Sequence, residues 1–194
     1  MSKRIGITGN IGGGKTTACR EFERLGIPVY YADERAKLLM VEDDSLRRGI
    51  VAAFGEQAYT PTGLNREFLG RSVFGYPERL AVLNGLVHPA VARDAERWQQ
   101  RQTAAPYTLH EAAIILEIGA QEQYDKLIVV DCPLAVRQRR VMTRDGASAE
   151  AFLARAERQW SDERKRAAAD YLIVNDGRSL LLPQVLRIDR LLRT

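Results

Sequence analysis

Eight residues near the N-terminus, Gly9–Thr16, constrain the fold of this chain more than any other segment. They fit the pattern G-x-x-x-x-G-K-[ST], follow an apolar run at Ile5–Thr8 and precede a helical pattern at Thr17–Leu25. Glycines allow the backbone to fold around a phosphate with its N–H groups pointing inward, and the N-terminus of the following helix adds the positive end of its dipole. The sequence therefore predicts a strand, a phosphate-binding loop and a helix, with a nucleoside triphosphate as ligand.

Two side chains of this loop have predictable roles. Lys15 can reach the β- and γ-phosphates of the triphosphate, and the hydroxyl of Thr16 can coordinate Mg²⁺. We therefore predict that the loop binds ATP with Mg²⁺. The alternative, a glycine-rich turn that matches by chance, leaves the order of strand, loop and helix unexplained. The residues expected to contact the nucleotide here are Ile11, Gly12, Gly13, Gly14, Lys15, Thr16 and Thr17.

Short β-branched or apolar runs recur along the chain, and a segment with helical spacing follows each of them. The runs are Arg4–Thr8, Pro28–Tyr31, Tyr107–His110, Lys126–Asp131 and Tyr171–Val174. This alternation predicts an α/β fold of the P-loop NTPase type, in which helices flank a parallel sheet. At 194 residues and 45% hydrophobic content, the chain suits a single domain over 1–194.

The β pattern disappears between Ala32 and Pro106, where apolar residues take helical spacing. This predicts a helical subdomain inserted at about 32–105, with turns at Thr60–Gly63 and Gly75–Pro77. At the other end of the chain, the pattern predicts a helix over Leu180–Leu192 that covers the sheet. Its buried face is expected to carry Leu182, Val185, Leu186 and Leu192.

The basic composition does not by itself identify a partner. The net charge is +4, and 24 of the 29 basic residues are arginines that are spread along the chain. Nucleic-acid binding would favour a concentrated basic stripe with interleaved aromatic residues, which are only 7% here. No run of about 18 apolar residues occurs. We expect a soluble cytoplasmic protein without nucleic-acid or membrane partners, in which Cys19 and Cys132 are small core residues.

Asp33 is a candidate general base, because it follows the second β run by two residues. Ligands of open α/β folds bind at the carboxyl ends of the strands. A carboxylate there can accept the proton of an attacking hydroxyl group. Asp33 could equally serve as the N-cap of a helix beginning at Glu34, and position alone leaves both interpretations open.

Two further sets of charged residues follow later strands. Arg137, Arg139, Arg140 and Arg144 lie on a predicted helix after Lys126–Asp131. An arginine that closes over the γ-phosphate stabilises the charge of phosphoryl transfer, although such residues can also form a solvated helix face. Glu111 could organise Mg²⁺ through water, or it could be a first-turn charge of a helix over Glu111–Gln121. His110 is expected to pack near the edge of the sheet.

The phosphate loop and Asp33, together with later segments, resemble the dephospho-coenzyme A kinase family over nearly the whole chain. The matching segments in the insertion are Gly63–Arg66, Phe74, Leu83-Asn84 and His88-Pro89, and those towards the C-terminus are Arg140–Asp145, Arg155, Gln159 and Ala169–Asn175. Two segments depart from the family pattern. Ala113-Ile114-Ile115 stands where the family usually has Pro-Leu-Leu, and Arg137 replaces a glutamine often found early in the lid helix.

The resemblance implies ATP-dependent phosphorylation of the ribose 3′-hydroxyl of dephospho-coenzyme A, the last step of coenzyme A synthesis. It implies catalytic roles for Asp33, Lys15 and Arg140, nucleotide contacts for Arg144 and Asn175, acceptor contacts for Asp33, Arg66, Asn84 and His88, and a lid at about 137–158. A structural role for His88 stays open. The rival hypotheses are another small-molecule P-loop kinase, a nucleotide-dependent switch and a nucleic-acid-binding ATPase. We expect a monomer.

Overall fold

The computed structural model describes residues 2–194 of the chain. The chain divides into two compact units. Of the described residues, the core unit comprises 2–31 and Gln99–Thr194, and the inserted unit comprises Ala32–Trp98.

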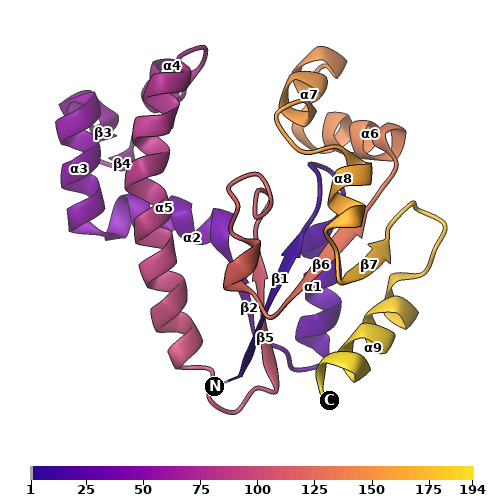
Figure 1. Cartoon of the computed structure of the whole chain (residues 1–194). Coiled ribbons are helices and arrows are strands. Elements are labelled where there is room, and N and C mark those ends of the chain that lie inside the picture. Colours follow the sequence, from indigo (N-terminus) through magenta and orange to yellow (C-terminus); the bar gives the residue numbers. More distant parts are fainter. Residues whose placement is uncertain (1) are drawn as a thin grey trace. The chain divides into compact units, whose positions relative to one another are not determined.

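A five-stranded parallel sheet forms the centre of the core unit (Figure 1). Its strands, in the order β2-β5-β1-β6-β7, are β2 (Val29–Tyr31), β5 (Tyr107–Glu111), β1 (Lys3–Thr8), β6 (Lys126–Asp131) and β7 (Tyr171–Val174). All five predicted strands are confirmed, each within one residue of its expected ends. Because neighbouring strands are parallel, their carboxyl ends meet at one edge of the sheet, which is where the phosphate loop follows β1.

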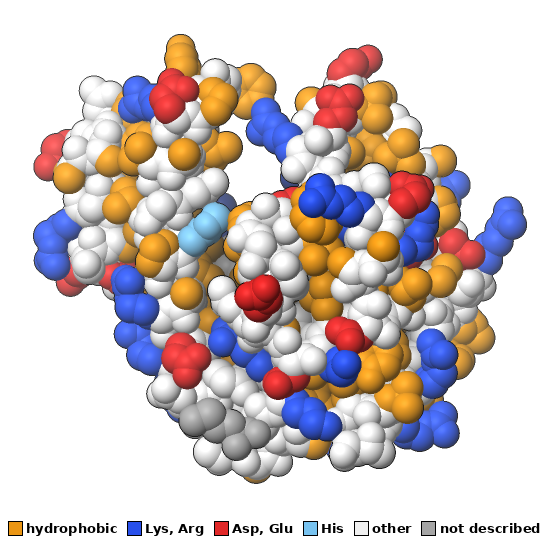
Figure 2. Space-filling model, in the orientation of Figure 1, with side chains coloured by type: hydrophobic (Ala, Val, Ile, Leu, Met, Phe, Trp, Pro, Cys, Tyr) orange, Lys and Arg blue, Asp and Glu red, His pale blue; other side chains and the backbone are white. Residues whose placement is uncertain are grey.

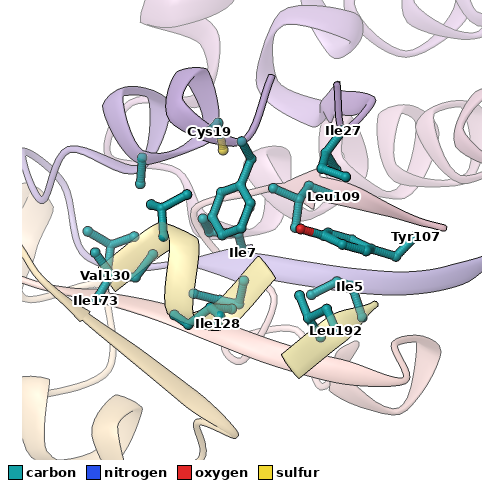
Figure 3. Packing of buried hydrophobic residues seen from close by; sticks show 14 residues of the cluster. Ile5, Ile7, Cys19, Ile27, Tyr107, Leu109, Ile128, Val130, Ile173 and Leu192 are labelled. Atoms are coloured by element: carbon teal, nitrogen blue, oxygen red, sulfur yellow. The ribbon is translucent and has the colours of Figure 1, made fainter. Parts of the chain in front are cut away.

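Apolar side chains cover both faces of this sheet. On one face, α1 (Lys15–Arg24) and α9 (Leu181–Leu192) pack on strand residues, as Figure 3 shows for Cys19, Leu192 and Ile128. On the other face, Leu127 and Val129 of β6 pack with residues that follow β5. Successive residues of β6 therefore point to opposite apolar layers, as expected for a strand buried on both sides.

The C-terminal helix buries a face that differs in part from the predicted one. Val185, Ile188 and Leu192 are buried, in the i, i+3, i+7 spacing of one helix face, whereas Leu182 and Leu186 are 46% and 36% exposed. The prediction was wrong for those two leucines, because it left Ile188 out of the buried face of the helix. Cys19 and Cys132 are buried and free.

The segment after β5 is not the helix that its sequence suggested. Glu111 is the last residue of β5, and residues 112–120 form turns that lead to η2 (Gln121–Gln123). Ile115 and Leu116 are buried against the sheet, and the turn closes with a hydrogen bond from Ala120 N to Ile115 O at 2.9 Å. The segment therefore covers the sheet closely, and the interpretation of Glu111 as a first-turn helix charge is wrong.

Three short helices complete the core unit: α6 (Leu134–Asp145), α7 (Ala149–Ala156) and α8 (Asp162–Ala167). Ser148 and Ser161 are the N-caps of α7 and α8, and each side chain accepts a hydrogen bond from a backbone N–H in the first turn. The predicted helix after β6 is confirmed as α6. In the face drawn in Figure 2, Lys and Arg side chains are interspersed with Asp and Glu.

The inserted unit is mostly helical. It contains α2 (Ala32–Glu42), α3 (Asp44–Phe54), η1 (Glu56–Ala58), a small hairpin of β3 (Tyr59–Thr60) and β4 (Gly63–Leu64), α4 (Arg66–Val73) and most of α5 (Pro77–Gln100). Ile50, Leu69 and Ala90 belong to its own apolar core. The two predicted turns are confirmed, one inside the hairpin and one between α4 and α5. Within residues 2–194, no helix combines the length and the apolar character needed to cross a membrane.

Candidate active site

The phosphate loop connects β1 to α1, and glycines are required at two of its positions. Gly12 and Gly14 have φ values of 77° and 89°, in the left-handed region that disfavours other residues. A Cβ atom at Gly14 would overlap the side-chain nitrogen of Asn175, and one at Gly12 would lie 2.7 Å from the carbonyl oxygen of Arg137. The loop is therefore closely surrounded by the segments that follow β6 and β7.

The side chain of Lys15, at the end of the loop, reaches back to the start of the loop. Its Nζ donates a hydrogen bond to Gly9 O at 3.0 Å and lies 3.8 Å from Oε1 of Glu111, and both side chains are almost completely buried. Glu111 comes to this position because β5 pairs with β1 in a register that sets Glu111 opposite Ile7. Two of the predicted site residues, one a cation and one an acid, are thus in contact range.

Oxygen atoms suited to a hard cation are present on the same elements. Thr16 is the second residue of α1, Glu111 ends β5, and the buried Oγ1 of Thr8 at the end of β1 has no hydrogen-bond partner within residues 2–194. Hydroxyl and carboxylate oxygens are the donors that Mg²⁺ prefers, and it usually takes few of them from the protein beside phosphate and water. These donors fit the predicted magnesium ion.

Arg140 and Asn175 lie next to the loop on its other side. The guanidinium of Arg140 donates to Oδ1 of Asn175 at 3.2 Å, and Nδ2 of Asn175 donates to Gly13 O at 2.8 Å. Arg140 also lies 3.4 Å from Sγ of Cys132, whose pKa is raised by burial and lowered in part by Arg140 itself. Helix α6, the loop and the end of β7 are therefore joined by two hydrogen bonds.

The other three arginines of α6 have different surroundings. Arg144 is mostly exposed and pairs with its neighbour Asp145 at 2.6 Å, and Arg139 is exposed. Arg137 is 4% exposed, so the interpretation of this residue as part of a solvated face is wrong. Its Nε donates to Cys132 O at 2.9 Å and its terminal nitrogen to Asp162 at 2.8 Å.

The sequence did not point to a set of polar contacts behind the loop. Ile11, which we expected at the nucleotide, donates its backbone N–H to Oε1 of Gln159 at 2.7 Å. The side chain of Asn10 donates to Asp162 at 2.5 Å and to Trp160 O at 3.2 Å. Such pairs join positions about 150 residues apart, and the only hint in the sequence was the resemblance at Gln159.

Lys165 and Glu117 form a second buried pair near these contacts. Nζ of Lys165 lies 2.8 Å from Oε1 of Glu117 and donates to Ala113 O at 3.2 Å, and the lysine is 1% exposed. Burial lowers the pKa of Lys165, while Glu117 partly offsets that effect. This pair anchors α8 to the turn segment after β5.

His110 is a buried residue of an interior strand. It is 2% exposed on β5, its Nε2 lies 3.0 Å from Gln99 Oε1, and its ring centroid lies 5.5 Å from that of Tyr30. Burial, and secondarily the charge of Arg4, lower its pKa to about 3. The expected packing role is confirmed, but β5 lies between β2 and β1 and not on the outside of the sheet.

The predicted acceptor residues all belong to the inserted unit. Asp33 is the second residue of α2, so this helix begins one residue before it and does not use it as the N-cap. Arg66 is the first residue of α4, capped by Asn65, whose side chain accepts from Phe68 N at 3.1 Å. Asn84 and His88 are four residues apart on α5 and therefore share a helix face.

Sequence comparison identifies the family. A model of dephospho-CoA kinase matches residues 3–180. A dephospho-CoA kinase of Bacteroides fragilis is 34% identical over 188 residues, which cover 97% of this chain and 92% of that protein. One from Salinibacter ruber is 42% identical over 176 residues, covering 89% and 88%.

Solved structures agree with the sequence comparison. A protein of Thermus thermophilus superposes with a TM-score of 0.87 at 34% identity, covering 98% of this chain and 97% of its own. Dephospho-CoA kinase from Campylobacter jejuni gives a TM-score of 0.71 at 27% identity, covering 98% and 96%. A shikimate kinase of Bacteroides thetaiotaomicron, at 0.51 and 16% with 99% of each chain covered, shows the P-loop kinase fold alone. This chain therefore belongs to the dephospho-CoA kinase family, which catalyses the final, ATP-dependent step of coenzyme A biosynthesis.

Proposed function

We propose that this chain transfers the γ-phosphoryl group of ATP to the ribose 3′-hydroxyl of dephospho-coenzyme A, giving coenzyme A and ADP, with Mg²⁺ as cofactor. The observation that carries the proposal is the contact between Lys15, at the end of the glycine-rich loop, and Glu111. The chain's membership of the dephospho-CoA kinase family gives this contact its meaning. The loop amides and the N-terminus of α1 would hold the phosphates. Lys15 would neutralise the charge on the β- and γ-phosphates.

The remaining residues have roles in positioning and proton transfer. Asp33 would accept the proton of the 3′-hydroxyl as its oxygen bonds to the γ-phosphorus and the bond to ADP breaks. Arg140, and secondarily Arg144, would stabilise charge on the transferred group. Thr16 would coordinate Mg²⁺ directly and Glu111 through water, and the bound ion would offset charge on the β- and γ-oxygens. Asn175 would contact the nucleotide from the end of β7.

The inserted unit would recognise the acceptor. Arg66, a cation at the start of α4, suits the phosphate groups of dephospho-coenzyme A, and Asn84 and His88 would supply hydrogen bonds from one face of α5. Helices α6 and α7 would serve as the lid over about 137–158. We also propose that the protein acts as a monomer in the cytoplasm. Sedimentation of the purified protein at several concentrations tests the first of these statements.

The activity is tested by a coupled ADP-release assay with ATP, Mg²⁺ and dephospho-coenzyme A. Adenosine, AMP, CMP and single-stranded DNA are assayed in parallel. ADP release only with dephospho-coenzyme A, and coenzyme A as product, is the expected result. Turnover of a nucleoside or nucleotide instead would favour another small-molecule kinase, and stimulation by DNA alone would favour a nucleic-acid-dependent ATPase.

The role of Asp33 is tested with Asp33→Asn, which removes the proton acceptor but keeps the size of the side chain. We expect kcat to fall by about 10²-fold or more, because general base catalysis contributes on that scale, while the Kd for ATP stays close to the wild-type value. The matched control is Glu34→Gln, since Glu34 is the other acidic residue in the first turn of α2. Near-normal turnover of Asp33→Asn would rule out its role as the base.

A further inference from the structure

The phosphate loop is held from outside by the chain segment that returns from the lid, residues 159–165. Two consecutive loop residues take part. Ile11 donates its N–H to Gln159, and Asn10 donates its amide to Asp162. Gln159 in turn donates to Ala113 O at 3.4 Å, which ties the same side chain to the segment after β5. The first half of the loop is thus attached to side chains that do not belong to the predicted set of nucleotide ligands.

Asp162 is the centre of these contacts. Its Oδ1 accepts from Asn10, and its two oxygens lie 3.0 and 2.8 Å from the terminal nitrogen of Arg137. Nε of the same guanidinium donates a hydrogen bond to the carbonyl oxygen of Cys132, the residue after β6. One carboxylate therefore joins the loop, the first turns of α6 and the start of α8.

The ion pair between Arg137 and Asp162 is mostly buried. The side chain of Arg137 is 5% exposed and that of Asp162 is 23% exposed. A buried guanidinium that loses its carboxylate is left uncompensated, so the pair holds its geometry firmly. The neighbouring acid, Glu163, is 78% exposed and pairs with Arg166 at the surface. Only one of the two first-turn acids of α8 can act on the loop.

The second buried pair keeps Asp162 in place. Glu117 binds both Lys165, one helical turn after Asp162, and the backbone N–H of Trp160 at 2.9 Å. The segment that presents Asp162 to the loop is therefore fixed on both sides of that residue.

We propose that Asp162 is a positioning residue of the phosphate loop, which acts through Asn10 and Arg137 to set the loop geometry that binds the ATP phosphates. Asp162 does not contact the nucleotide in this proposal. Arg137 occupies the position where the family resemblance led us to expect glutamine. In this proposal it is the buried cation that pairs with Asp162, and it does not bind the transferred phosphoryl group. The proposal rests on the proposed function, because it concerns affinity for ATP.

The test compares the wild type with Asp162→Asn, Asn10→Ala, their double variant and Glu163→Gln. Asp162→Asn removes the charge that Arg137 requires. Asn10→Ala removes the hydrogen bonds from the loop to Asp162 and to Trp160 O and leaves the Arg137–Asp162 pair intact, so it keeps the test decisive if Asp162→Asn does not fold. Glu163→Gln is the matched control, since it removes the same charge from the same helix turn at an exposed position. Circular dichroism and thermal unfolding establish that each variant is folded.

The readouts are the Kd of ATP by calorimetry and the steady-state constants for both substrates. We expect Asp162→Asn and Asn10→Ala each to raise the Kd and KM for ATP about tenfold, equivalent to about 1.4 kcal/mol. The kcat at saturating ATP and the KM for dephospho-coenzyme A should stay within about twofold, a split that loss of stability alone does not produce. The double variant should be little worse than either single variant, because both remove one linkage.

Different results overturn different statements. Folded Asp162→Asn and Asn10→Ala with wild-type affinity for ATP, or with effects that simply add, would refute the positioning role. An equal loss in Glu163→Gln would show that only helix charge matters. If the wild-type protein binds ATP but does not phosphorylate dephospho-coenzyme A, the proposed function fails while the calorimetric comparison still decides the role of Asp162.

Discussion

Acidification should destabilise this protein through one buried histidine. His110 lies on an interior strand, where its Nε2 faces Gln99 Oε1 and its Nδ1 lies 3.5 Å from the guanidinium of Arg4. Since arginine can only donate, Nδ1 is the acceptor and the ring is neutral with its proton on Nε2. Burial, and then the charge of Arg4, lower the pKa of His110 from 6.5 to about 3.

The sign of the pH effect follows from this difference. Between pH 6.5 and 3 the unfolded chain binds a proton at His110 and the folded chain does not, so the free energy of unfolding falls as the pH falls. The contribution is almost fully present above pH 6.5. It decreases by about 2 kcal/mol on going from pH 7 to pH 5, and by about 5 kcal/mol at most once the pH reaches the folded pKa.

The measurement is urea unfolding followed by circular dichroism, at intervals from pH 8 to pH 5. The comparison variant is His110→Gln, because a glutamine amide can donate to Gln99 and accept from Arg4 without titrating. Carboxylates titrate in both proteins, so the difference between the two stability curves isolates His110. We expect wild type to lose about 2 kcal/mol more than His110→Gln between pH 7 and pH 5. Parallel curves over this range would refute the assignment of His110 as a buried neutral group.

Two substitutions test the loop and the buried pair behind it. Gly14→Ala should weaken ATP binding in calorimetry by at least about tenfold, because its Cβ would displace the side chain of Asn175. Gly26→Ala is the control: its φ is similar, at +81°, but the space around it is open, so the affinity for ATP should not change. Equal affinities for the two variants would contradict this. Lys165→Met should lower the free energy of unfolding by about 3–5 kcal/mol in urea, because it leaves the carboxylate of Glu117 unpaired, and adding Glu117→Gln should recover much of the loss. A loss below about 1 kcal/mol would show that the pair is not required.

The sheet and the loop could be predicted from the sequence because their signals are local. Strands such as Lys126–Asp131 are short apolar runs bounded by polar residues, and a strand buried on both faces requires this composition. The loop carries its own pattern of glycines. The family resemblance added Arg140 and Asn175, which the structure brings together beside Gly13, and it also added Arg144, which the structure places on the exposed side of α6.

The contacts behind the loop could not be predicted, because a charge in a sequence does not reveal its partner. Arg137 lies among three other arginines of one helix, and only the fold decides that it is buried and the others are not. The same applies to Lys165, which is one of five lysines. The helix predicted after Glu111 was wrong for a related reason. Its apolar spacing suits a helix, but burial against the sheet is achieved by turns.

Sheet order explains why residues so far apart in the sequence meet at one edge of the sheet. Strands β5, β1, β6 and β7 are adjacent and parallel, so Glu111 and Asp131, which end their strands, lie at the same edge as the phosphate loop and Asn175, which follow theirs. Strand β2 pairs with β5 so that Tyr31 lies opposite Glu111, and Asp33 is only two residues further along the chain. Two residues span at most about 7 Å, so Asp33 is tethered to this edge by covalent connection, whichever way the helices of the inserted unit carry Arg66, Asn84 and His88. The proposed role of Asp33 as the base requires such a short connection, because phosphoryl transfer needs the attacking hydroxyl group held close to the γ-phosphate.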